Sequence, residues 1–121
     1  MKECAITVLT TLGQGHSEAV YHSAMDVMFR TNGIKYASEV TVPITFMGCG
    51  IGFHRLDTVL YSDTVTVIIE YKSIARLKEQ EENQVRAYLR ATGYAYGILV
   101  NFGTGNVPEI RRVELESALS A

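Results

Sequence analysis

The spacing of apolar residues along the chain predicts three helices and four strands. Apolar positions recur at helical intervals in the first twelve residues and again from Ser17 to Thr31. A third amphipathic helix, charged in its first turns, is predicted over residues 75–91. Runs rich in β-branched and aromatic residues predict strands, and these lie at 35–47, 53–61, 64–72 and 94–102.

Residues that favour caps and turns mark where these elements end. Ser17 is placed to cap the second helix, and Asn32, followed by glycine, is placed to stop it. Gly93 ends the third helix, and the glycine-rich stretch 48–52 predicts the turn between the first two strands. Pro43 lacks an amide proton, so the first strand is predicted at a sheet edge or beside a bulge.

The order of the elements predicts one domain of the α/β (α+β) class over residues 1–121. Helix, helix, three strands, helix and strand imply a mixed four-stranded sheet flanked by helices. A right-handed crossover through helix 75–91 lays strand 94–102 parallel to strand 64–72. The strand at 94–102 is apolar throughout, which suits the interior of a sheet. Residues from 107 onward are polar and mixed, and their pattern fits either a short strand or a short helix.

Three charged residues stand where the two hairpin strands should be apolar. Side chains alternate along a strand, so Glu70 and Lys72 point to one face. A tight hairpin near Ser62 pairs Asp57 with residue 68 or residue 70, which puts Asp57 on that same face. The sequence therefore predicts two acids and a lysine that converge from adjacent strands.

Two neighbouring carboxylates repel each other unless a cation lies between them. A hard divalent cation such as Mg²⁺ would satisfy Asp57 and Glu70, because it prefers oxygen ligands. The backbone carbonyl of Tyr71 is placed to supply another oxygen, and Lys72 to orient a bound water or to stabilise charge on a phosphate. On spacing alone, a partly solvated ion pair between Lys72 and one of the acids explains the same residues.

Polar and aromatic residues also share helix faces that should be apolar. Gln84 and Tyr88 lie four residues apart on the third helix, and Glu18 and Tyr21 lie three apart on the second. The stretch Gly15-x-x-Glu18-x-x-Tyr21 resembles the GxxExxY protein family, a branch of the PD-(D/E)XK nuclease-like superfamily. The similarity runs from about residue 8 to residue 113 and takes in "LGQGHSEAVYHSAM", "VPITFMG", "HRLD", "IIEYKSI", "QVRAYL", "GYAYGILVNFG" and "RRV".

The resemblance implies a fold and a metal site. The fold is the restriction-endonuclease-like αβββαβ core, with the site at one edge of its sheet. Asp57 and Glu70 are implied as ligands of Mg²⁺ or Mn²⁺, and Glu18 as an acid that reaches the metal directly or through water. Lys72 is implied as the catalytic lysine.

Further residues are expected to shape the site or to contact nucleic acid. Gln84 and Tyr88 match a Q-x-x-x-Y element similar to that of the RecB and lambda-exonuclease branch, where such residues shape the site and contact the metal site or the nucleic acid. Tyr21, from the motif on the second helix, is expected to shape the site as well. Arg55 is placed either to meet a phosphate or to pair with Glu70.

Other charged residues have simpler explanations. His22 follows Glu18 by four residues and is interpreted as an exposed helix histidine. Arg86 and Arg111 belong to a modest basic rim along the third helix, which the neighbouring glutamates make a solvated helix face.

Composition narrows the class of partner and the location. The chain has 11 Lys and Arg against 13 Asp and Glu, so it lacks the basic stripe of a strong nucleic-acid binder, and phosphate contacts are expected to be local, metal-assisted or shared. Cys4 and Cys49 have neither disulfide nor metal-site spacing, which indicates a reducing, cytoplasmic location. No apolar run approaches a membrane span, and the N-terminal segment is interpreted as a helix of the fold and not as a signal peptide.

The function predicted from these features is a Mg²⁺- or Mn²⁺-dependent nuclease that hydrolyses phosphodiester bonds in DNA, with RNA as the less favoured substrate. A homodimer would lengthen the nucleic-acid track of so small a domain. The alternative is a catalytically silent module of the same fold that binds nucleic acid or a protein partner, and the acidic net charge favours it.

Overall fold

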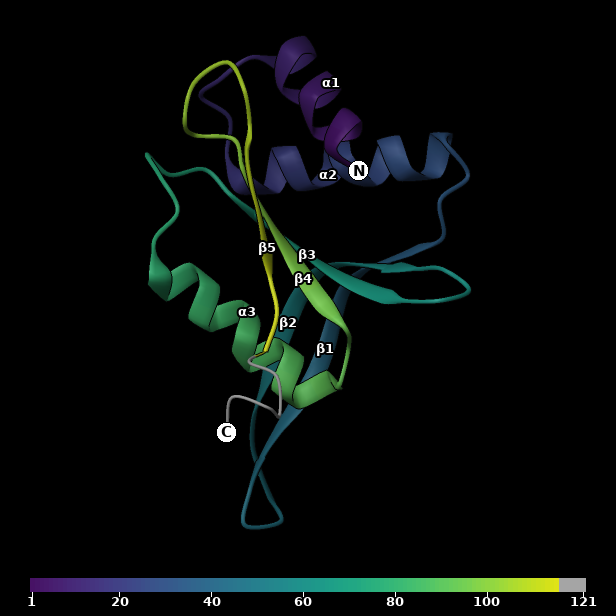
Figure 1. The fold of residues 1–121 in the computed structure, drawn as a ribbon, viewed down its shortest axis with the longest axis vertical. Coiled ribbons are helices and arrows are strands. Elements are labelled where there is room, and N and C mark those ends of the chain that lie inside the picture. Colours follow the sequence, from purple (N-terminus) through teal and green to yellow (C-terminus); the bar gives the residue numbers. More distant parts are fainter. Residues whose placement is uncertain (116–121) are drawn as a thin grey trace.

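The computed structural model describes residues 1–115, which form a five-stranded sheet with helices on both faces (Figure 1). Two helices precede the sheet, and a third connects its third and fourth strands. In chain order the elements are α1 (Lys2–Leu12), α2 (Glu18–Thr31), β1 (Tyr36–Phe46), β2 (Cys49–Tyr61), β3 (Thr66–Lys72), α3 (Glu79–Thr92), β4 (Tyr96–Asn101) and β5 (Glu109–Val113).

The strands lie in the order β1-β2-β3-β4-β5, and every neighbouring pair is antiparallel except β3 and β4. The parallel pairing of β3 with β4 confirms the predicted crossover through α3. β1 lies at an edge, as Pro43 predicted, and β4 lies inside the sheet, as its apolar sequence predicted. The mixed sheet and its flanking helices confirm the predicted fold class.

The sheet has one strand more than the four that the sequence predicted. The additional strand, β5, comes from the polar segment after residue 107, for which a strand and a helix were both open. Ile110 packs toward the core under α1 and α2, whereas Val113 packs toward the core under α3. A segment that buries side chains on both faces in this way is stabilised as a strand by the sheet it joins.

Two predicted boundaries are wrong. The turn between β1 and β2 was predicted at residues 48–52, but it consists of only the two residues after Phe46. Strand β2 therefore begins at Cys49 and not at residue 53. Helix α3 begins at Glu79 and not near residue 75. The residues before it are held as a loop by Asn101, whose side chain accepts a hydrogen bond from the Ile74 N–H (3.0 Å) and donates one to the Ile74 carbonyl (2.9 Å).

Each face of the sheet is covered by helices. α1 and α2 pack on one face, where Tyr21 and Phe29 of α2 are completely buried. α3 packs on the other face through Val85 and Leu89. Gly97 of β4 allows α3 to lie close to the sheet, because a Cβ at this position would collide with Val85.

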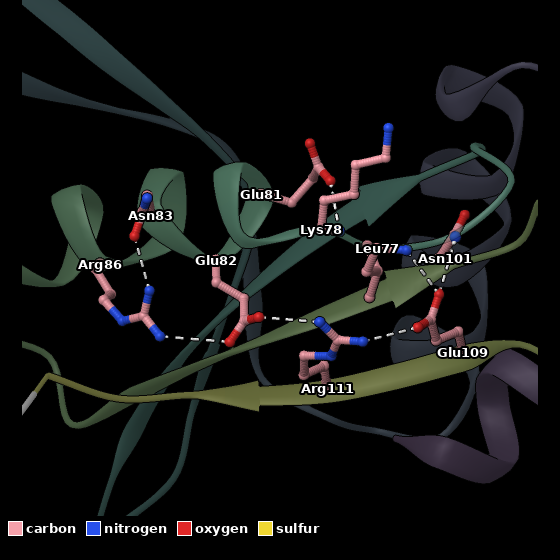
Figure 2. Close-up of polar contacts among 9 residues, drawn as sticks. All are labelled: Leu77, Lys78, Glu81, Glu82, Asn83, Arg86, Asn101, Glu109 and Arg111. Carbon is pink, nitrogen blue, oxygen red and sulfur yellow. Dashed lines mark hydrogen bonds and ion pairs between the residues drawn. The ribbon is translucent and has the colours of Figure 1, made fainter.

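A chain of ion pairs fixes α3 against β5 (Figure 2). Glu82 of α3 accepts a hydrogen bond from Arg111 of β5 (2.9 Å) and lies 3.4 Å from Arg86, one turn further along the helix. Arg111 also pairs with Glu109 (3.0 Å), which accepts a hydrogen bond from the backbone N–H of Leu77 before α3 (2.9 Å). These contacts set the position of α3, and they neutralise two arginines of the basic rim.

α1 packs its apolar face into the core that it shares with α2, through Cys4, Ala5, Val8 and Leu9. Within residues 1–115, no helix combines the length and the apolar character that are needed to cross a membrane.

Candidate active site

The backbone pairing between β2 and β3 ends immediately before the two predicted acids. The last paired residues are Thr58 and Ile69. Beyond them, the backbone N–H of Asp57 donates to Oε1 of Glu70 (3.0 Å), and the backbone N–H of Tyr71 donates to Oδ2 of Asp57 (3.0 Å). The two carboxylates take the place of backbone carbonyls where the strands separate. Of the two predicted registers, the structure has the one that puts Asp57 beside residue 70.

Glu70 lies in surroundings that oppose its negative charge. The residue is only 4% exposed. Burial is the main cause that raises the pKa of Glu70 to about 8, and the charges of Asp57 and Glu18 also raise it. The hydrogen bond from the Asp57 backbone and the charge of Lys72 lower this pKa without offsetting the burial. Glu70 therefore needs a proton or a cation beside it at neutral pH.

Lys72 lies two residues beyond Glu70 on β3 and is positioned by α3. Its Nζ donates a hydrogen bond to Oε1 of Gln84 (2.9 Å). Tyr88, one turn later on α3, is buried, and its ring lies 4.9 Å from the ring of His54 on β2. Burial, followed by the charges of the two acids, raises the pKa of Tyr88, so its hydroxyl stays protonated. The structure thus brings both polar residues of α3 to the site.

A cleft of about 250 Å³ opens beside Asp57, between the start of α2 and the β1–β2 hairpin. Glu18, the first residue of α2, lines this cleft from one side. Arg55 and Glu39 line it from the other, and their charged groups lie 3.6 Å apart. Arg55 therefore pairs with Glu39. Of its two predicted contacts, a phosphate or Glu70, the pairing with Glu70 is wrong.

Tyr21 and the glycines before Glu18 shape the turn that leads into α2. Gly15 has a φ of 94°, a conformation that residues with a Cβ rarely adopt. Tyr21 is completely buried; its hydroxyl donates to the carbonyl of Gly13 (2.8 Å), and its ring stacks on Phe102 with centroids 4.5 Å apart. In this motif the glycine permits the turn, the tyrosine fixes it, and the glutamate emerges at the cleft. Tyr21 thus supports the turn before Glu18 from the core.

The donor atoms at the site are those that Mg²⁺ and Mn²⁺ prefer. Each carboxylate uses one oxygen on a backbone N–H, while Oδ1 of Asp57 and Oε2 of Glu70 accept no hydrogen bond from residues 1–115. Oxygens of this kind are what a hard cation accepts, so the two acids would hold such an ion. Among the residues that the structure describes, no three His, Cys, Asp or Glu side chains gather closely enough to hold a metal. Glu18 would accordingly reach a cation through water.

A polar network beneath the cleft was not predicted. His22, interpreted as exposed, is mostly buried and lines the cleft; its Nε2 lies 3.0 Å from Oγ of Ser38 and 3.3 Å from Oδ2 of Asp26. Asp26 also accepts a hydrogen bond from Thr58 (3.0 Å), whose hydroxyl accepts one from Tyr71 (3.1 Å). The spacing of histidine and aspartate four residues apart on α2 was the signal available in the sequence.

Asn101 is a second residue that sequence reasoning missed. It is completely buried at the end of β4, where it lies beside Lys72 in the parallel register. Besides its bonds to Ile74, it donates to Oε1 of Glu109 (3.2 Å). Gly103 follows closely, and a Cβ there would collide with the backbone of Ile74. Together they set the path of the chain that leaves Lys72, and the signal was one polar residue at the end of an apolar strand.

The central sheet with helices on both faces, and an acid pair followed by a lysine where its strands separate, define a nuclease fold. The chain belongs to the PD-(D/E)XK nuclease superfamily, whose family model matches residues 1–113. No curated protein matches the chain.

Two solved structures show the same fold. The crystal structure of SSO0001 superposes with a TM-score of 0.64 at 18% identity, over 85% of this chain and 52% of that one. The chain thus spans about half the length of SSO0001. An alkaline exonuclease from Laribacter hongkongensis superposes with a TM-score of 0.51 at 14% identity, over 96% of this chain and 78% of that one.

Proposed function

We propose that this protein hydrolyses phosphodiester bonds in DNA, with RNA as a less favoured substrate, and that it requires Mg²⁺ or Mn²⁺. The observation that carries the proposal is the pair of Asp57 and Glu70, held where β2 and β3 separate, with Lys72 beside it. Membership of a nuclease superfamily and similarity to an alkaline exonuclease support it. A bound cation would supply a Lewis acid for the phosphate and an activated water.

Each residue has a role that follows from its position. Asp57 and Glu70 would hold the cation through the oxygens that the backbone leaves free, and Glu70 would release its proton on binding. Lys72, fixed by Gln84, would orient the attacking water or stabilise the charge that develops on the phosphate. Glu18 would bind a water of the cation from across the cleft.

The finer assignment that we propose is the GxxExxY family, near the RecB and lambda-exonuclease branch. The motif that leads into α2 and the pair of Gln84 and Tyr88 over the acids support it. Arg55, exposed at the mouth of the cleft, would exchange Glu39 for a phosphate oxygen. We further propose a homodimer, which would extend the track for nucleic acid; sedimentation equilibrium measures it.

Isosteric variants test the site without removing its hydrogen-bond acceptors. Asp57→Asn and Glu70→Gln keep an oxygen for the backbone N–H groups, whereas alanine would leave buried donors unpaired at a cost of about 1–3 kcal/mol. We expect each of them, and Lys72→Met, to lower the rate of DNA cleavage in Mn²⁺ by roughly 100-fold or more, with circular dichroism unchanged. Asp63→Asn, in the exposed loop of the same hairpin, is the matched control and should cleave normally.

The three substitutions Asp57→Asn, Glu70→Gln and Lys72→Met are also combined in one variant. If this purified triple variant cleaved DNA at the rate of the parent, the activity would lie outside this site. Linear, circular and single-stranded DNA, with an RNA of the same sequence, serve as substrates. They separate cleavage at ends from internal cleavage, and DNA from RNA.

A silent binding module is the second candidate, and one observation favours it. Asp57 and Glu70 already accept backbone hydrogen bonds, so they stabilise the fold whether or not a cation binds. Calorimetric titration with Mg²⁺ and Mn²⁺ separates the candidates. The nuclease should bind Mg²⁺ or Mn²⁺, and this binding should disappear in Asp57→Asn and in Glu70→Gln. A silent module should show no metal binding that depends on these two acids.

A further inference from the structure

The outer part of the β1–β2 hairpin carries an exposed apolar surface that the proposed chemistry does not use. This part extends beyond the rest of the sheet as an arm (Figure 1). Phe53 is 74% exposed and Phe46, nearer the tip, is 64% exposed. Clusters of large apolar side chains at such exposure mark contact surfaces more often than they mark inert surface.

The arm has two different faces. On one face, Val40, Val42 and Leu56 pack into the core under α3. The opposite face, here called the outer row, is exposed at every position. On β2 it consists of Ile51, Phe53 and Arg55, and on β1 it has Pro43 opposite Phe53 and Thr41 opposite Arg55.

The outer row leads directly to the cleft of the candidate site. Arg55 lines that cleft together with Asp57, and Phe53 is the next residue of the row on the side away from the acids. Residues that follow one another on one face of a strand lie about 7 Å apart. A chain bound at the cleft and continuing along the arm would therefore meet a guanidinium first and an aromatic ring next.

We propose that the outer row binds single-stranded nucleic acid, with a base stacked on Phe53 and a backbone phosphate on Arg55. The proposal rests on the proposed function, because it takes the strand to be the one whose phosphate enters the cleft. An aromatic face next to a cation matches the two parts of a nucleotide, a flat apolar base and an anionic phosphate. Paired bases of a duplex are already stacked on each other, so the row selects for single strands or frayed ends.

A second copy of the chain fits the arm less well. Its exposed apolar side chains, those of Phe46, Met47, Ile51 and Phe53, amount to on the order of 500 Å². A standard interface buries about 800 Å² on each partner. Phe46 also lies on the strand face opposite to that of Phe53, so one flat contact does not cover both.

Phe53→Ala and Phe46→Ala form a matched pair for the test, because they remove the same side chain from the two faces of one arm. Fluorescence anisotropy in EDTA with a labelled single strand of about 12 nucleotides measures binding apart from cleavage. We expect the Kd to rise about tenfold in Phe53→Ala and less than about twofold in Phe46→Ala. A blunt duplex of the same length should show less than about a twofold change in both variants. An RNA strand of the same sequence compares the two kinds of nucleic acid.

Phe53→Trp gives an independent reading, because the chain contains no tryptophan. The substitution keeps an aromatic surface at the same place, so binding should remain within about twofold of the parent. Stacking of a base on the new indole should quench its fluorescence as single strand is added.

Four results would overturn the proposal. They are no binding of single strand by the parent, no loss in Phe53→Ala, the same loss in Phe46→Ala, or the same loss with duplex. A change from dimer to monomer in Phe53→Ala, seen by sedimentation, would assign the row to a second copy instead. Since binding is measured without metal, a protein that binds in the expected way but never cleaves would retain the arm site and refute the nuclease proposal.

Discussion

Glu70 serves the fold and the proposed chemistry with different atoms. Its Oε1 accepts the backbone N–H of Asp57, and its Oε2 is open to a cation. Because burial raises its pKa to about 8, a proton neutralises the side chain when no cation is present. A cation that bound at this residue would therefore displace its proton.

The stability of the metal-free protein should fall as the pH rises from about 5 to about 9. Glu70 has a pKa of about 8 in the folded state against an ordinary value of 4.5, so the folded state binds the proton more tightly. The stabilisation is complete below the ordinary pKa and is lost as the pH approaches the raised one. Glu70→Gln cannot ionise, so it should match the parent at the lower pH and exceed it by a few kcal/mol at the higher pH. Urea unfolding in EDTA measures both.

Two controls accompany this measurement. Glu39→Gln, which removes an exposed acid from the same cleft, should leave the pH profile unchanged. Excess Mg²⁺ at the higher pH should raise the Tm of the parent and not that of Glu70→Gln. Parallel stability curves for the parent and Glu70→Gln would contradict the raised pKa.

At the scale of elements, boundaries set by local chemistry were predicted and boundaries set by distant residues were not. Ser17 caps α2 by accepting a hydrogen bond from Val20, and Gly93 ends α3 in the left-handed conformation, both as the sequence predicted. The start of α3 has a local cap, in which Glu81 accepts a hydrogen bond from the Lys78 N–H, but the loop before it is held by Asn101, which lies beyond the helix on β4. The pattern of residues near a boundary cannot contain such a partner.

The same distinction applies to the candidate site. The alternation of strands and the length of one hairpin narrowed the position opposite Asp57 to residue 68 or residue 70, and the structure has residue 70. His22 was misjudged because a helical pattern shows which side of α2 meets the core but not which neighbour covers its rim. That neighbour is the β1–β2 hairpin, through Ser38, and only the assembled sheet brings it there.

Gly97→Ala should destabilise the protein by about 1–3 kcal/mol, because the added Cβ collides with Val85 and forces α3 away from the sheet. Gln84 precedes Val85, so its contact with Lys72 should loosen in the same variant and lower cleavage beyond the loss of folded protein. Gly50→Ala is the matched control, since a Cβ there meets nothing within 4 Å. Denaturant unfolding compares the two, and equal stabilities would show that the packing of α3 tolerates the extra methyl group.

The molecule as a whole carries no net positive charge that would attract nucleic acid. The formal net charge is −2, and Arg86 and Arg111 are engaged by Glu82. Near the candidate site, the cations that could meet a phosphate are Arg55, in exchange for its pairing with Glu39, and Lys72, which bonds the neutral Gln84. Recognition must then depend on a few local contacts, which agrees with the expectation from composition that phosphate binding is local.

Binding of single-stranded DNA should accordingly depend weakly on salt. Two phosphate contacts give a slope of log K against log salt of about −1.4. Kd values measured from about 50 to about 200 mM KCl should change only several-fold. A slope steeper than about −4 would reveal a longer basic track on another surface.

The hydrogen bonds between the two acids and the opposing backbone also bear on how relatives of this protein should be compared. Both acids accept backbone hydrogen bonds in the sheet, so a relative that no longer hydrolyses DNA should still keep an oxygen acceptor at each position, as the acid or as its amide. Within residues 1–115, the Lys72 amino group has one hydrogen-bond partner, Gln84, and it accepts no backbone hydrogen bond that would hold the sheet together. Among distant relatives, the lysine is therefore a better marker of catalytic activity than the two acids.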